Sequence, residues 1–131
     1  MPKSTAVGNG FEIEVKKTLE KDGYSVFRQH RKPLFMKGKM ITIGADVFGC
    51  DLIARKQGQP TLWVQVSTVS QKSTKEKQVL EHPWNLIDEK VQLWLRVDGK
   101  KEFRVFDLQV AGDTTHFYIF RELETRKVPK E

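Results

Sequence analysis

Three polar side chains at the ends of a predicted β-hairpin carry oxygen atoms suited to a divalent metal ion. Asp51 precedes one apolar segment, and Gln65 and Ser67 alternate with apolar residues in the next. A turn centred near Gly58 places Asp51 opposite Gln65, with cross-strand neighbours about 5 Å apart. Side chains alternate along a strand, so Gln65 and Ser67 share one face. Carboxylate and amide oxygens favour magnesium or manganese, which can activate a water molecule toward a phosphodiester.

Glu12 is a further candidate, on the first predicted helix. Apolar residues recur there every four positions, which predicts a helix over about 10–22 with Gly23 as its C-terminal cap. These residues are Phe11, Val15 and Leu19. Glu12 lies at the edge of their stripe and is able to face the sheet. The alternative is a capping box in which Asn9 is the N-cap and Glu12 bonds back to the helix start. Asp46 is a second-tier candidate, because it is out of register with a turn centred near Gly58.

The elements that position these residues belong to a single α/β domain of 131 residues. Strands are predicted over 24–28, 52–54, 62–66, 91–97, 103–110 and 116–120, and a second helix over 74–82. Asp98-Gly99 predicts a hairpin turn, and Pro83 ends the second helix. Residues 29–43 predict a long basic loop or a ragged hairpin. The ends, 1–8 and 124–131, are predicted to be flexible.

The composition of the chain narrows the classes of partner that we expect it to bind. Lys and Arg number 23 against 17 Asp and Glu, a net charge of +6 that favours a polyanion such as nucleic acid. Cys50 is the only cysteine, so an intramolecular disulfide is excluded, and we expect it to pack as a small buried side chain. No zinc-ligand spacing is present, and His30, His82 and His116 are read as bystanders. No apolar run is long enough to span a bilayer, so we expect no membrane partner and a cytoplasmic location.

Four segments of the first half of the chain resemble the PD-(D/E)XK nuclease superfamily, in particular archaeal-type Holliday junction resolvases and their phage relatives. The matching segments are Gly8-Asn-Gly-Phe-Glu12, Gly23-Tyr-Ser-Val-Phe-Arg28, Phe48-Gly-Cys-Asp51-Leu-Ile-Ala and Leu62-Trp-Val-Gln65-Val-Ser67. The resemblance implies a restriction-endonuclease-like fold, a mixed central β-sheet flanked by helices. It also implies magnesium- or manganese-dependent cleavage of branched DNA, such as four-way junctions, in a bacterial, archaeal or phage-infected cell.

The resemblance further implies a role for individual residues. Glu12, Asp51 and Gln65 are metal ligands, with the carbonyl of Val66 as a possible fourth, and Arg28 lies near the scissile phosphate. The family has a glutamate at the position of Gln65 and a lysine at that of Ser67. We expect Lys72 or Lys75, on the next helix, to supply the positive charge. The residues expected to contact DNA are Arg28, Arg31, Lys32, Lys37, Lys39, Lys72 and Lys75.

Two other functions stay open. One is a structure-selective DNA-binding protein that keeps the nuclease fold without efficient cleavage. The other is a restriction-like nuclease on linear duplex. Symmetric cutting of a junction needs two active sites, so we expect a homodimer, with the Trp-containing C-terminal strands as a candidate interface. Trp63, Trp84 and Trp94 are otherwise expected to be core or interface residues.

Overall fold

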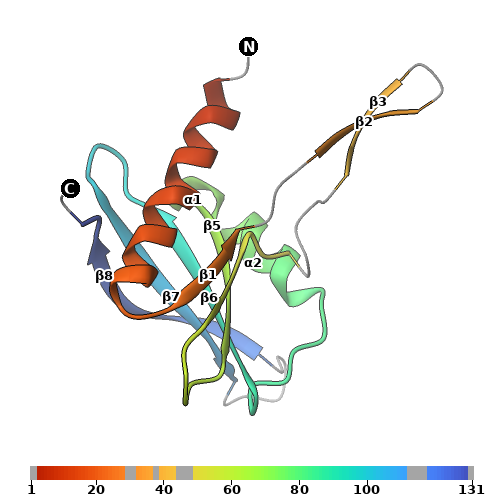
Figure 1. Cartoon of the computed structure of the whole chain (residues 1–131). Helices are drawn as coiled ribbons and strands as arrows, with labels where there is room; N and C mark the ends of the chain where they lie inside the picture. The colour runs from red at the N-terminus through yellow and green to blue at the C-terminus, as the bar shows by residue number, and fades with distance from the viewer. Residues whose placement is uncertain (1–2, 29–31, 37–38, 44–48, 112–117, 130–131) are drawn as a thin grey trace.

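Within the residues that the computed structural model describes, two α-helices flank a mixed six-stranded sheet, and a separate hairpin projects from it (Figure 1). The described residues are 3–28, 32–36, 39–43, 49–111 and 118–129, with the backbone alone for 3–9, 32–36 and 39–43. The elements are α1 (Lys3–Lys21), β1 (Ser25–Arg28), β2 (Lys32–Met36), β3 (Lys39–Ile43), β4 (Leu52–Arg55), β5 (Thr61–Thr68), a 3-10 turn (Val69–Gln71), α2 (Lys72–Leu80), β6 (Glu89–Arg96), β7 (Glu102–Val110) and β8 (Tyr118–Lys127). The predicted α/β class and mixed sheet are confirmed.

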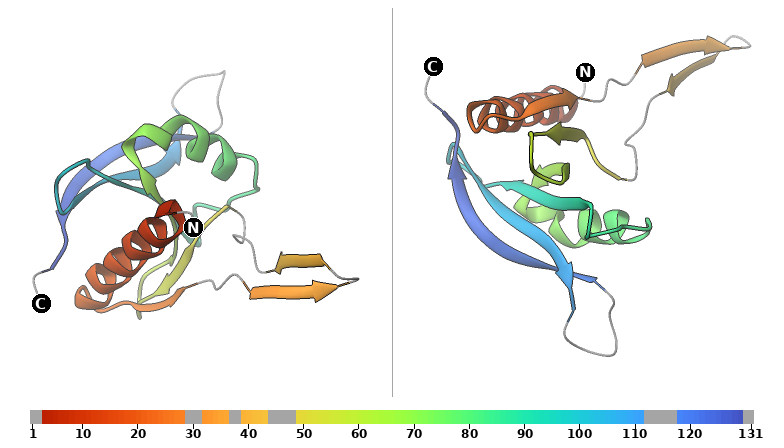
Figure 2. Two further views of the ribbon diagram at one scale, coloured as in Figure 1. Left: turned by 90° about the horizontal axis from the view of Figure 1, so that it is seen from above. Right: turned by 60° about the horizontal axis from the view of Figure 1, so that its bottom comes forward.

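The strand order is β1-β4-β5-β6-β7-β8, and β5 and β6 are the one parallel pair in this sheet. Parallel neighbours need a crossover connection, and α2 provides it. The middle of β6 is buried on both faces, as expected for a run, Val91 to Leu95, that is apolar apart from Gln92. The sheet is therefore the middle layer of three, with α1 on one face and α2 on the other (Figure 2).

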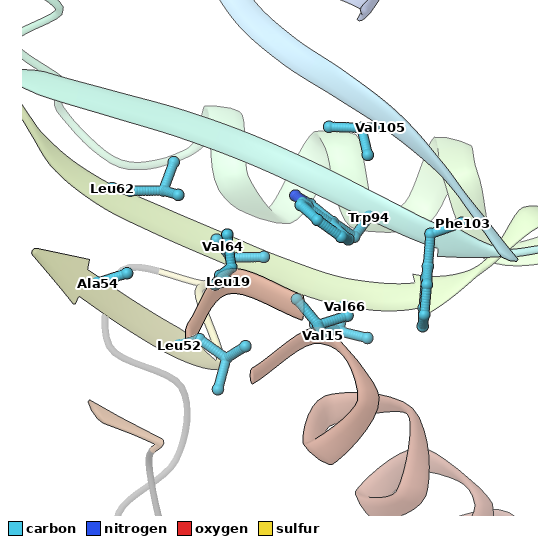
Figure 3. Close-up of a cluster of buried hydrophobic side chains, with 10 residues drawn as sticks. All are labelled: Val15, Leu19, Leu52, Ala54, Leu62, Val64, Val66, Trp94, Phe103 and Val105. Atoms are coloured by element: carbon cyan, nitrogen blue, oxygen red, sulfur yellow. The ribbon is translucent and has the colours of Figure 1, made fainter. Parts of the chain in front are cut away.

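Two apolar clusters join these layers. On one face Val15 and Leu19 of α1 point toward the central strands (Figure 3). The other members of that cluster are Leu52, Ala54, Leu62, Val64, Val66, Trp94, Phe103 and Val105. On the opposite face, Val79 of α2 packs with residues that include Cys50, Leu93 and Phe106. Cys50 is fully buried, as predicted. Full burial of one such aliphatic side chain contributes about 1.5–3 kcal/mol, which is why these faces determine where each helix docks.

The register of the central hairpin is the predicted one. Leu52 pairs with Val64 and Ala54 with Leu62, so the turn is centred on Gly58. That glycine has φ +80°, a conformation that residues with a side chain rarely adopt. The strands predicted over 24–28, 91–97 and 103–110 are also present, displaced by one or two residues at their ends.

Helix α1 begins seven residues earlier than predicted. It starts at Lys3, so the expectation of a flexible segment over 1–8 is wrong for 3–8, and Asn9 lies inside the helix instead of capping it. The capping-box alternative for Glu12 is therefore wrong as well. Gly8 and Gly10 suggested a start because glycine disfavours helices by about 1 kcal/mol. The helix nevertheless continues through both glycines.

The C-terminal strand is also longer than predicted. β8 pairs with β7 from Tyr118 to Lys127, so the expectation of a flexible tail over 124–131 is wrong for 124–127. The charged sequence was misleading because β8 is an edge strand, where charged side chains are common. Arg104 on β7 donates hydrogen bonds of 2.7 and 2.9 Å to Glu122 on β8, and these lower the pKa of that carboxyl group.

The end of β8 is tied to the turn that follows α1. Arg126 Nη2 donates a 2.7 Å hydrogen bond to Asp22 Oδ2. Val128 packs against the α1-side cluster, and its N–H donates to the Lys101 carbonyl at 3.0 Å. The last described residues therefore contribute to closing the core over α1.

The tryptophans are core residues, as predicted. Trp94 is 1% exposed beneath α1, and Trp84 is buried beside the half-buried Trp63, with ring centroids 5.6 Å apart. Because Trp94 is enclosed within one chain, it is not available to the interface expected on the C-terminal strands. Among the described residues no helix combines the length and apolar character needed to cross a membrane.

Candidate functional site

Asp51 lies where the pairing of β4 with β5 stops. Its N–H donates to the Val64 carbonyl at 2.8 Å, and its Oδ2 accepts the N–H of Val66 at 2.9 Å. The side chain thus takes the place of a strand partner, and the residue is 6% exposed. In a strand, the N–H and C=O of one residue point to the same edge. The carbonyl of Val66 therefore faces the edge at which Asp51 lies, and the structure brings these two predicted ligands together.

Gln65 stands across from Asp51 by continuation of the β4–β5 register and is 1% exposed. Its Nε2 donates a hydrogen bond to the carbonyl of Gly49. A carbonyl only accepts hydrogen bonds, so the amide nitrogen is the atom that faces Gly49, and Oε1 lies on the other side of the amide group. Gly49 is closely packed, since a Cβ there would lie 3.3 Å from the Gln78 carbonyl of α2. The sequence analysis missed this role of Gly49.

Glu12 reaches the same end of the sheet through Arg28. Arg28 Nε donates a 3.1 Å hydrogen bond to Glu12 Oε1, and the two side chains are 18% and 17% exposed. Arg28 pairs with Leu52, the residue after Asp51. Glu12 also lies one turn before the buried Val15, at the edge of the apolar stripe, as predicted. The cation expected at the scissile phosphate thus neutralises the carboxylate expected at the metal, an ion pair that the sequence did not reveal.

Lys72 and Lys75 point to different parts of the molecule. Lys72 bonds Glu76 at 2.8 Å, and its Nζ lies 5.0 Å from the ring centroid of Phe106 on β7. Its charge also contributes, after the hydrogen bond from Arg104, to the lowered pKa of Glu122. Lys72 is therefore directed toward β7 and β8. Lys75 is half-buried and stands one helical turn before Val79, whose Cα would lie 3.4 Å from a Cβ on Gly49.

Ser67, on the face shared with Gln65, is half-buried. Lys32 and Lys39 lie on strands of the β2–β3 hairpin, which projects away from the six-stranded sheet (Figure 1), and only their backbone is described. This hairpin confirms the ragged-hairpin alternative for residues 29–43. The predictions for Arg31, Lys37, Asp46, His30 and His116 fall outside the described residues. His82 is half-buried just after α2.

The donor set at this position consists of hard oxygen ligands, the chemistry that magnesium and manganese require. Asp51, the carbonyl of Val66 and Gln65 fit such an ion, and Glu12 fits once it is released from Arg28. Across the described part of the chain, no three carboxylate, histidine or cysteine side chains form a metal-binding group. Comparison of the chain with protein-family models, curated proteins and solved structures found no match.

Proposed function

We propose that this chain is a divalent-metal-dependent endonuclease that cuts branched DNA such as four-way junctions. The observation that carries the proposal is the hydrogen bond of the Asp51 carboxylate with the Val66 main chain, next to Gln65, whose amide donates to Gly49 just before β4. Glu12 lies on α1 and is joined to the end of β1, beside Leu52, through Arg28. These are the positions that the resemblance to PD-(D/E)XK nucleases assigns to the metal. A mixed sheet with a helix on each face supports a restriction-endonuclease-like fold.

In this proposal Asp51, Gln65, Val66 and Glu12 hold a magnesium or manganese ion, which when bound supplies Lewis-acid activation of water and of the phosphodiester. The Val66 N–H fixes the Asp51 carboxylate in one orientation. Asp51 is almost fully buried, so its charge acts in an environment of low effective dielectric, where electrostatic interactions are stronger than in water. Arg28 balances Glu12 in the absence of other ligands and is placed to contact a phosphate.

The partners follow from the same proposal. Cutting both strands of a junction symmetrically requires two sites, so the active form is a homodimer. The β2–β3 hairpin, whose sequence from 29 to 43 is rich in Lys and Arg, extends the positive surface along the DNA backbone. Such an enzyme acts in the cytoplasm, where its substrate is found.

A second candidate function is a structure-selective DNA-binding protein that does not cleave. Two observations favour it specifically. Gln65 brings no negative charge to the site, and the charge of Glu12 is offset by Arg28. A site with less negative charge holds a divalent cation more weakly.

The experiment that separates these functions compares one four-way junction with a linear duplex of the same arm sequence. The protein is incubated with each labelled DNA in magnesium, in manganese and in excess EDTA. We expect cleavage of the junction only with metal. Binding of the junction without products in either metal favours the non-cleaving alternative. Equal cleavage of the linear duplex favours a restriction-like nuclease instead.

Lys75→Ala is expected to slow metal-dependent cleavage at least tenfold, whereas Lys72→Ala leaves it nearly unchanged. The reason is that Lys75 stands one helical turn from the part of α2 that meets Gly49, while Lys72 is engaged with Glu76 and Phe106. Loss of one electrostatic group at a transition state typically costs about 10²–10³ in rate when the group is ideally placed. Single-turnover rates measure the effect. If both variants cleave at the wild-type rate, neither lysine replaces the missing charge at Ser67.

A further inference from the structure

Phe27 is an exposed aromatic residue on the same sheet face as Gln65. It is 62% exposed, although it stands in the middle of a strand. Phe27 pairs with Ile53, and Ile53 pairs with Trp63, so an apolar row crosses β1, β4 and β5. α2 packs against β5 and β6 on this face, and Phe27 lies at the free edge of the sheet beyond them. A large exposed aromatic side chain at such a position is typical of a binding surface.

Two shallow grooves meet at Phe27. The first, about 430 Å³, runs between α1 and β1 and is lined by Ile13, Lys16, Lys17, Glu20, Val26, Phe27 and Arg28. The second, about 410 Å³, lies over β1 and β4 and is lined by Ser25, Val26, Phe27, Ile53 and Arg55. Phe27 therefore forms a ridge with apolar surface on both sides and polar groups at the rims.

The charge around Phe27 indicates which class of molecule would bind there. The grooves are lined by four cationic side chains and a single carboxylate, Glu20, and one of the four, Arg28, is already paired with Glu12. That carboxylate already accepts a 2.9 Å hydrogen bond from Lys16. A second copy of the chain would bring the same excess of positive charge to the interface and be repelled. A nucleotide combines a flat apolar base with an anionic phosphate, and it complements both features.

The ridge lies close to the candidate site. Arg28 pairs with Leu52, the residue after Asp51, and Phe27 pairs with Ile53, two positions from Asp51. Residues offset by two positions on neighbouring strands are about 7–8 Å apart. The spacing equals roughly two steps of stacked bases at 3.4 Å each.

We propose that Phe27 stacks on an unpaired base of bound DNA, one or two nucleotides from the phosphate held near Asp51, and that Lys17 and Arg55 contact the flanking phosphates. The inference rests on the proposed function for its ligand, DNA, but not for cleavage. It identifies the substrate feature that the surface selects, an unstacked base beside the cleavage point. Such bases occur where a duplex branches and are absent from an uninterrupted duplex.

A binding cycle in EDTA tests this without any cleavage. Wild type and Phe27→Ala are titrated with a fluorescent thymidine octanucleotide and with an octamer of abasic sites, which has the same charge but no bases. Phe27→Ala should weaken binding of the thymidine octamer about 5- to 150-fold, the range for one base stacked on an aromatic ring, and leave the abasic octamer unaffected. Phe27→Trp should restore the stronger binding of the thymidine octamer relative to the abasic octamer. Ile87→Ala, at a residue 87% exposed elsewhere, should change neither affinity.

Each contrary result overturns the stacking proposal. Equal losses of affinity for both octamers would mean that Phe27 contacts DNA without stacking on a base. No loss of affinity for either octamer would mean that Phe27 does not contact DNA. A change in sedimentation on Phe27→Ala without base-dependent binding assigns the ridge to self-association. Because metal is absent, these failures leave junction cleavage untouched, and failure of cleavage leaves base-dependent binding intact.

Discussion

Asp51→Asn is expected to lower metal-dependent junction cleavage at least about 100-fold while the protein stays folded and binds DNA. Asparagine has nearly the same shape, and its oxygen can still accept the 2.9 Å hydrogen bond from the Val66 N–H. What is lost is the negative charge at a residue only 6% exposed. Loss of one preorganised electrostatic group typically costs 10²–10³ in rate.

Cleavage rates at saturating DNA, with circular dichroism as a check of folding, measure this effect. Asp107→Asn is the matched control, because Asp107 is a half-buried aspartate on β7, away from β4, and should cleave at the wild-type rate. Equal cleavage by wild type and Asp51→Asn would remove Asp51 from the site. No cleavage by wild type in either metal would contradict the enzymatic proposal.

Gln65→Glu should make folding depend on the metal. Without a divalent ion the free energy of unfolding should fall by roughly 1–3 kcal/mol, because the Gly49 carbonyl loses its buried donor. The new carboxylate also lies across from Asp51, and like charges in close proximity repel. Magnesium should recover this loss, since the variant presents one more charged oxygen ligand. The variant should therefore gain more thermal stability from magnesium than wild type does.

Thermal unfolding with and without magnesium measures the difference. Gln92→Glu is the control, because Gln92 is also nearly buried but its oxygen accepts a hydrogen bond from Trp94 Nε1, a role that a glutamate oxygen can keep. Its response to magnesium should match that of wild type. If Gln65→Glu is destabilised equally with and without the ion, Gln65 is a structural residue and no metal binds beside it.

The local pattern of the sequence was sufficient to predict the parts of the fold that depend on residues close together in the chain. Alternation of side chains and the Gly58 turn predict the register that brings Asp51 to Gln65, and Gly23 ends α1 as expected. Its N–H donates to Glu20 and that of Tyr24 to Leu19, at 3.0 and 3.1 Å, which is the bonding of a glycine-terminated helix.

The missed features depend on tertiary contacts. Pairing with β7 orders a β8 sequence that looks like a solvated tail. The ion pair of Glu12 with Arg28 joins residues 16 positions apart, which neither helical nor strand periodicity reveals. The same holds for the hydrogen bond from Gln65 to Gly49.

The tie between Arg126 and Asp22 spans 104 positions of the chain. A nascent chain leaves the ribosome from its N-terminus, so α1 and the central hairpin emerge long before their last partner. Until residues 126–128 are free of the exit tunnel, the end of α1 lacks its ion pair and the α1-side cluster lacks Val128. This domain can therefore complete its folding only after residue 128 has left the exit tunnel, and until then the edge of β7 that β8 will cover stays exposed.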